Sequence, residues 1–303
     1  MNQNKTLIKV ENVSKSFGDI KALRGVSMSL QAGQVIALLG ENGAGKTTLI
    51  NHLLGRETPD SGSVSIAGHT PGSYPARQTI GAVLQSAAMP ETLTVKEHIE
   101  LFSSYYSSPR TLTNTLEIAG LTELQNRKFK ALSGGQKQRV LFAIAICGQP
   151  PIILLDEPTV GLDVQSRRQF WQCIRNLREQ GTCVLLTTHY LEEADALADQ
   201  VLLLNKGEIV HQGSSESLKQ RLGGKRIRFT YSDPTAAFEH LPAVNHVMYR
   251  GSQIELISEC AEETATALLT QYPTLSDLTI EQVSLEDAFI HFSVKDNDKE
   301  LAA

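Results

Sequence analysis

The sequence has few cysteines, no long apolar run and no excess of positive charge. Its four cysteines, Cys147, Cys173, Cys183 and Cys260, are scattered without C-x-x-C spacing, which indicates free thiols in a reducing compartment rather than a disulfide framework or metal site. No apolar run approaches the roughly 20 residues that span a bilayer. The first ten residues, MNQNKTLIKV, are too polar for a secretory signal.

Lysine and arginine number 28 against 33 aspartate and glutamate, so the formal net charge is −5. Because sequence-independent binding of nucleic acid depends on a basic excess that neutralises phosphates, no nucleic-acid partner is expected. The 303 residues are 41% hydrophobic and 20% charged, which is typical of a soluble globular protein of one large or two ordinary domains.

The stretch GENGAGKTT fits the phosphate-binding pattern G-x-x-x-x-G-K-[ST]. An apolar run at residues 35–39 precedes this stretch, and a helix-like run at residues 48–54 follows it. The phosphate-binding motif requires this succession of strand, loop and helix. Lys46 is predicted to reach the β- and γ-phosphates, and the Thr47 hydroxyl to bind Mg²⁺. The alternative is a glycine-rich turn that happens to carry a lysine. The predicted nucleotide-binding residues here are Gly40, Glu41, Asn42, Gly43, Ala44, Gly45, Lys46, Thr47 and Thr48.

Three further strands end in polar side chains suited to phosphate chemistry. Residues 151–157 form an apolar strand that closes in Asp156, predicted to hold Mg²⁺, and Glu157, predicted to orient and polarise the attacking water. The strand at 182–189 ends in His189, a candidate sensor of the γ-phosphate. A lone histidine there is more often structural. Gln85 closes a strand at 80–85, where ligands bind in open α/β sheets, although alone this signal is weak.

Two segments outside these strands have both a structural and a ligand-binding interpretation. The sequence LSGGQ at 132–136 is predicted to begin a helix, with Ser133 as its N-cap. Its glycines leave the first N–H groups of the helix open to an anion. The alternative is an ordinary capped helix that binds no ligand. The LSGGQ sequence lies in a predicted helical insertion at about residues 90–148. Phe17 follows the first strand, where an aromatic residue is more often part of the core than of a ligand site.

The pattern changes after Gly223 and Gly224, the predicted domain boundary. Residues 226–282 read as strand, helix, strand, strand, helix and strand, with the first helix at 235–241, which predicts a small α+β ferredoxin-like domain. A capped helix is expected from Ser284 to Phe292. Near the start of the chain, residues 31–34 are predicted to form a hairpin into the strand at 35–39.

Over roughly residues 7–223 these motifs together resemble the ATP-binding subunit of ABC transporters. The resemblance implies an α/β P-loop NTPase cassette, residues 1–223, with an antiparallel β subdomain and the helical insertion, followed by an accessory domain at 224–303. It implies ATP and Mg²⁺ as ligands and catalytic roles for Lys46, Gln85, Glu157 and His189. It assigns Mg²⁺ to Thr47, Gln85 and Asp156, adenine stacking to Phe17, and nucleotide contacts to Ser133, Gly134, Gly135 and Gln136.

The resemblance also implies partners. Two copies would meet head to tail and sandwich two ATP molecules, so that the signature, the LSGGQ sequence at residues 132–136, of one copy faces the phosphate loop of the other. The dimer would drive an integral membrane permease from the cytoplasmic face of the membrane. Residues 284–289, SLEDAF, are similar to the tails of exporter subunits. The alternative is a soluble ABC ATPase that acts on ribosomes or nucleic acid, although such proteins usually carry two cassettes or a long coiled coil.

Overall fold

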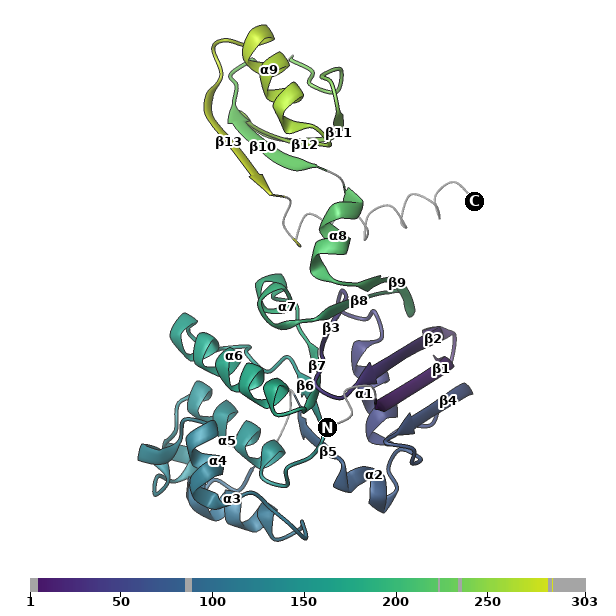
Figure 1. The fold of residues 1–303 in the computed structure, drawn as a ribbon, viewed down its shortest axis with the longest axis vertical. Helices are drawn as coiled ribbons and strands as arrows, with labels where there is room; N and C mark the ends of the chain where they lie inside the picture. Colours follow the sequence, from purple (N-terminus) through teal and green to yellow (C-terminus); the bar gives the residue numbers. More distant parts are fainter. Residues whose placement is uncertain (1–4, 85–88, 223, 234–235, 283–284, 286–303) are drawn as a thin grey trace. The chain divides into compact units, whose positions relative to one another are not determined.

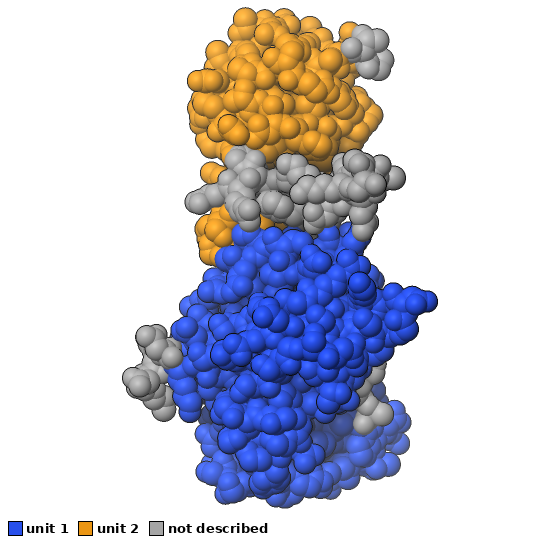
Figure 2. All heavy atoms as spheres, turned by 90° about the vertical axis from the view of Figure 1, so that its right-hand side faces the viewer, with its two compact units in different colours: residues 1–213 blue, residues 214–303 orange. Residues whose placement is uncertain are grey.

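The computed structural model describes residues 5–84, 89–222, 224–233, 236–282 and 285. The chain divides into two compact units, Met1–Gly213 and Ser214–Ala303, shown in separate colours in Figure 2. This division precedes the predicted boundary, so that helix α8 (Ser215–Leu222) is grouped with the second unit. The assignment of the units to an ATP-binding cassette and an accessory domain stays a prediction.

The first unit is built on a six-stranded sheet in the order β5-β6-β7-β3-β8-β9 (Figure 1). Its strands are β3 (Val35–Leu39), β5 (Ile80–Val83), β6 (Ile152–Asp156), β7 (Cys183–Thr187), β8 (Gln200–Asn205) and β9 (Glu208–Gly213). All neighbours pair in parallel except β8 and β9. The carboxyl ends of the parallel strands therefore meet at one edge of the sheet. The residues predicted to bind phosphate follow these strand ends in the sequence.

Both faces of this sheet are covered, and every residue of β3, β6 and β7 is buried. Figure 1 shows α1 on one side of the sheet and α5 and α6 on the other. The helices that contact the sheet include α1 (Lys46–Leu54), α5 (Gly134–Ile146), α6 (Val164–Glu179) and α7 (Leu191–Leu197). Double coverage explains why these strands read as unbroken apolar runs without alternation.

A second, three-stranded antiparallel sheet lies in the same unit, in the order β2-β1-β4. Its strands are β1 (Thr6–Phe17), β2 (Ile20–Gln31) and β4 (Ser61–Ile66). Because β2 and β3 belong to different sheets, the predicted hairpin at residues 31–34 is wrong. The segment is a link between sheets, fixed where the Gly33 N–H donates to Gly181 O at 3.0 Å. The change from alternating burial in β2 to full burial in β3 marks this switch.

The predicted helical insertion is confirmed. After the short α2 (Tyr74–Gln78), it contains α3 (Val95–Ser103), α4 (Leu112–Ile118) and two 3-10 turns (Thr122–Leu124 and Phe129–Ala131) before α5. A reciprocal capping box starts α3, in which Thr94 accepts from the Glu97 N–H and the Glu97 carboxylate accepts from the Thr94 N–H. Phe142 of α5 packs on Phe170 of α6 with ring centroids 4.7 Å apart, which joins the insertion to the layer over the sheet.

The second unit contains a four-stranded antiparallel sheet in the order β11-β12-β10-β13, together with helix α9. The elements are β10 (Lys225–Thr230), β11 (Val244–Arg250), β12 (Gln253–Ser258), α9 (Ala261–Gln271) and β13 (Ser276–Gln282). The third strand along the chain inserts between the first and second, which is the strand order of the predicted ferredoxin-like domain. The identity of the domain itself stays a prediction.

The helix predicted at residues 235–241 is wrong, because the described residues 236–241 form turns and irregular backbone. Phe238 and Leu241 are nevertheless buried, and Phe238 packs edge-on against Phe229 at 5.1 Å. Their i, i+3 spacing is also that of residues on one face of a helix, which is why a helix was predicted. Here both side chains are buried from a loop. The helix predicted from Ser284 to Phe292 lies outside the described residues, apart from Leu285, which is buried.

Candidate functional site

Three adjacent strands deliver the predicted site residues to one edge of the six-stranded sheet. In the pairing register, Thr187 at the end of β7 stands opposite Leu38 of β3 on one side and Asp156 of β6 on the other. The glycine-rich loop follows β3, Glu157 follows β6 and His189 follows β7. The fold therefore brings the residues 40–48 loop, Asp156, Glu157 and His189 together from three distant parts of the sequence.

Two glycines of the phosphate loop are required by packing. A Cβ on Gly40 would lie 2.4 Å from the carbonyl oxygen of Leu204, at the end of β8, and one on Gly45 would lie 2.4 Å from that of Ala22 in β2. Gly45 also has a φ of +108°, which side chains rarely adopt. The loop is thus held between β2 and β8 while its outer residues, 41–43, stay exposed.

Lys46 begins α1 and lies largely buried at the base of the loop. Its ammonium donates to the carbonyl oxygens of Gly40 at 2.7 Å and Glu41 at 3.0 Å. Burial lowers the pKa of Lys46, while the charges of Glu157 and Asp156 raise it. The described residues supply two acceptors to a group with three donors, so the ammonium can also serve a phosphate oxygen. No side chain caps α1, which leaves its first N–H groups for an anion.

The buried Asp156 carboxylate is held by a residue that the sequence interpretation missed. The Thr187 hydroxyl donates to Asp156 Oδ1 at 2.5 Å, and the Glu157 N–H is directed at both the hydroxyl and carbonyl oxygens of Thr187, each 3.1 Å away. Thr187 thereby fixes the Asp156 carboxylate and the Glu157 backbone to β7. A threonine pair just before His189 is the only sign of this role in the sequence.

Glu157 leaves its strand in a left-handed conformation, with a φ of +49°. Such a backbone costs a non-glycine residue on the order of 1–2 kcal/mol and is concentrated at functional sites. His189 Nδ1 lies 3.5 Å from Glu157 Oε1, with the imidazole half exposed and the carboxylate mostly buried. The two predicted catalytic side chains therefore stand beside each other at the mouth of the site.

The oxygen donors here suit Mg²⁺ carried with a nucleotide. Asp156 offers a buried carboxylate, and Thr47 lies exposed in the first turn of α1. Among the described residues no cluster of three or more histidine, cysteine, aspartate or glutamate side chains forms a metal site. Magnesium typically uses one or two protein ligands together with waters and substrate phosphates, which matches this sparse set.

Phe17 is not a core residue. It is the last residue of β1, pairs with Ile20 across the hairpin and is 47% exposed. The Lys15 ammonium lies 5.6 Å from the ring centroid and is itself held by Asp60 at 2.9 Å. Strand β2 continues from this hairpin to Ala22, which touches Gly45 of the phosphate loop. An exposed aromatic ring near the loop supports the prediction that Phe17 stacks on adenine.

Replacing Phe17 by alanine should therefore weaken ATP binding without a comparable loss of stability. Base–aromatic stacking contributes about 1–3 kcal/mol, so we expect Kd for ATP to rise roughly 5- to 150-fold. ATP titration and melting of the nucleotide-free protein measure the two effects separately. Tyr74→Ala, which removes a ring 68% exposed elsewhere in this unit, is the matched control. A lower melting temperature with unchanged ATP affinity would return Phe17 to a structural role.

The signature residues open helix α5. Ser133 and Gly134 are exposed at the start of α5, and Ser133 forms a reciprocal capping box with Gln136 at 3.1 and 3.3 Å. The other end of α5 lies against edge strand β5, where a Cβ on Gly81 would meet Ala145 O at 1.9 Å. The 13-residue helix is about 20 Å long, so it carries the signature well beyond this contact. Gln85 lies outside the described residues.

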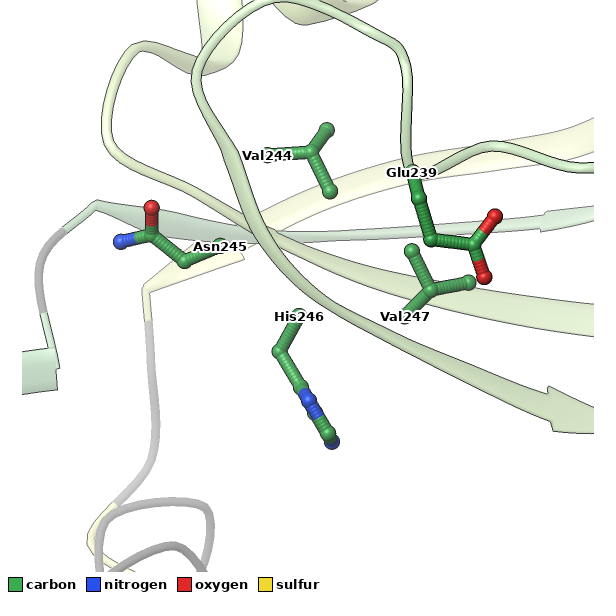
Figure 3. A pocket seen from close by; sticks show the side chains of 5 residues that line it. All are labelled: Glu239, Val244, Asn245, His246 and Val247. Carbon is green, nitrogen blue, oxygen red and sulfur yellow. The ribbon is translucent and has the colours of Figure 1, made fainter.

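Other features of the described residues do not coincide with this site. A pocket of about 410 Å³ in the second unit is lined by Glu239, Val244, Asn245, His246 and Val247 (Figure 3), none of them a predicted site residue. All four cysteines are free, and burial raises the pKa of Cys183 to about 12. In the described part of the chain no helix has the length and apolar character needed to cross a membrane.

Comparison with known proteins agrees with this arrangement. The family model described as "ABC transporter" matches residues 23–160. The linearmycin resistance ATP-binding protein of Bacillus subtilis is 32% identical, over 95% of this chain and 98% of its own length. The Nod factor export ATP-binding protein I of Ralstonia nicotianae is 31% identical, over 95% and 94%.

Among solved structures, the chain is similar to a dimeric post-hydrolysis state of the ATP-binding cassette MJ0796 bound to ADP and phosphate. The TM-score is 0.62 at 29% identity, over 69% of this chain and 98% of that one. This structural match covers nearly all of the MJ0796 cassette, and the resistance and export proteins match nearly the whole of this chain. The chain belongs to the ATP-binding subunits of the ABC transporter family, and it is an ATPase of that family.

Proposed function

We propose that this ATPase powers an exporter, working as a head-to-tail homodimer beneath a membrane permease. The observation that carries the proposal is the convergence of Lys46, Asp156, Glu157 and His189 at the carboxyl edge of β3, β6 and β7, while the signature at Ser133 faces outward. The first group provides the phosphate-binding half of an ATP site. In the proposed dimer, the second completes the site of another copy.

In the proposed reaction, Lys46 and the open N–H groups of α1 bind the phosphates and neutralise their charge. Glu157 accepts a hydrogen bond from the attacking water and directs it at the γ-phosphorus. His189, beside that carboxylate, donates to the γ-phosphate. Mg²⁺, held by Asp156 and Thr47, would supply positive charge to the phosphate oxygens. Catalysis is then mainly positioning and charge stabilisation, as phosphoryl transfer requires.

Release of the phosphate removes the negative charge that the two copies share, so the dimer reopens. The dimeric MJ0796 cassette named above supports an assembly of two copies. The relatives named for resistance and export support outward transport. The protein would act at the cytoplasmic face of the membrane, peripheral through its permease. A membrane protein that copurifies with it, in preference to ribosomes, would separate this role from that of a soluble ABC ATPase.

The head-to-tail arrangement is tested by mixing two inactive chains, Lys46→Ala and Ser133→Arg. Each variant alone should lack ATPase activity, because every site in its homodimer carries a defect. A mixed dimer rebuilds one intact site from the phosphate loop of one chain and the signature of the other. We expect partial recovery of activity in the mixture, measured as released phosphate. Proven mixed dimers that stay inactive would contradict it.

A further inference from the structure

Glu193 is a buried carboxylic side chain that the proposed reaction does not use. It lies in the first turn of α7 with 0% of its surface exposed. Its Oε1 accepts a hydrogen bond of 3.0 Å from the indole Nε1 of Trp171 on α6. Burying a carboxyl is unfavourable unless its oxygens are hydrogen-bonded, so its place in the interior needs a reason.

The second oxygen points to that reason. Glu193 Oε2 and the Thr159 hydroxyl are both buried, and neither has a hydrogen-bond partner of ordinary geometry within the described residues. Burial raises the pKa of Glu193, although the hydroxyls of Thr188 and Thr159, the Trp171 indole and the Arg167 charge act to lower it. A carboxyl so placed can accept from Trp171 with one oxygen and form a hydrogen bond with the Thr159 hydroxyl through the other after a small shift.

Two neighbours of this carboxyl, Thr159 and Thr188, belong to the two loops that carry site residues. Thr159 lies two residues after Glu157, in the loop that ends at Asp163, the N-cap of α6. Thr188 directly precedes His189, and its hydroxyl accepts from the Tyr190 N–H at 3.0 Å. The Arg167 guanidinium of α6 lies 4.4 Å from the Tyr190 ring centroid, which is a direct contact between α6 and the histidine segment at 188–190.

We propose that Glu193 is a positioning residue for ATP hydrolysis, whose carboxyl ties the loop at 157–163 and the segment at 188–190 to Trp171. In this way it keeps Glu157 and His189 in register with each other. The inference rests on the proposed roles of those two residues. It does not involve the phosphate loop, so Glu193 should govern turnover and leave nucleotide affinity alone.

The test is steady-state ATPase kinetics of three variants. Glu193→Ala should lower kcat about tenfold or more, since small displacements of reacting groups reduce rates strongly, with KM for ATP within about twofold. Glu193→Gln should keep most of kcat, because its amide can accept from Trp171 and donate to Thr159. Trp171→Phe keeps an aromatic ring without the donor and should show an intermediate loss of kcat.

Glu255→Ala is the matched control for the loss of a buried carboxylate. Glu255 is 2% exposed in the second unit and pairs with Arg228 at 3.0 Å, so its removal should lower the melting temperature and leave kcat per folded molecule unchanged. The proposal is overturned if Glu193→Ala keeps kcat within twofold of wild type, or if affinity falls in step with kcat. Wild-type kcat in Trp171→Phe would also overturn it. Activity in Glu157→Gln, assayed alongside, would instead defeat the underlying assignment of the site.

Discussion

Glu157→Gln is expected to bind ATP and hardly hydrolyse it. An amide has the shape of the carboxylate but cannot polarise the attacking water, so we expect kcat to fall on the order of 10²-fold or more. The geometry favours a clean result, because the backbone of Glu157 is fixed by the two oxygens of Thr187 rather than by its own side chain. Phosphate release under saturating ATP measures the loss, and ATP binding measured separately should be kept.

The matched control is Glu192→Gln, which makes the same chemical change on an exposed side chain at the start of α7. It should leave the rate unchanged. If two copies close around ATP as proposed, the Glu157→Gln variant should also accumulate as an ATP-dependent dimer in sedimentation. Near wild-type turnover would remove Glu157 from the role assigned to it.

Lys46→Ala is expected to abolish the stabilisation of the protein by ATP. At a concentration a hundredfold above Kd, a ligand stabilises the folded state by about 2.7 kcal/mol, or roughly 5–10 °C in melting temperature for a unit of this size. The variant loses the charge that faces the phosphates, and it loses the bonds to Gly40 and Glu41 that shape the loop. The variant also removes the positive charge beside Asp156 and Glu157. The two carboxylates then repel the negatively charged phosphates of ATP more strongly.

Differential scanning calorimetry with and without ATP measures this shift in melting temperature. Lys46→Met, which keeps most of the apolar stem, separates loss of charge from loss of packing and should behave like the alanine variant. Lys96→Ala is the control, since this side chain is 45% exposed and forms a 3.6 Å surface pair with Glu100. An ATP-induced shift in Lys46→Ala equal to that of wild type would contradict the assignment.

Local patterns predicted the elements that meet at the site, because each of their strands is an apolar run followed by a glycine-rich loop or ended by a polar residue. They failed where spacing was ambiguous between two structures. Phe238 and Leu241 have helical spacing but lie in a loop, and residues 31–34 have turn composition but join two sheets. Thr187, Glu193 and Trp171 were missed because their roles come from contacts between elements far apart in the sequence.

The position of Thr187 between Leu38 and Asp156 limits how the chain can vary. Side chains alternate across a strand, so inserting or deleting one residue within β7 would turn the Thr187 hydroxyl to the opposite face of the sheet. It would also displace His189 by one position relative to Glu157. An exposed loop can gain or lose residues without moving the strands. The number of residues from Cys183 to His189, in contrast, cannot change without separating Asp156 from the Thr187 hydroxyl.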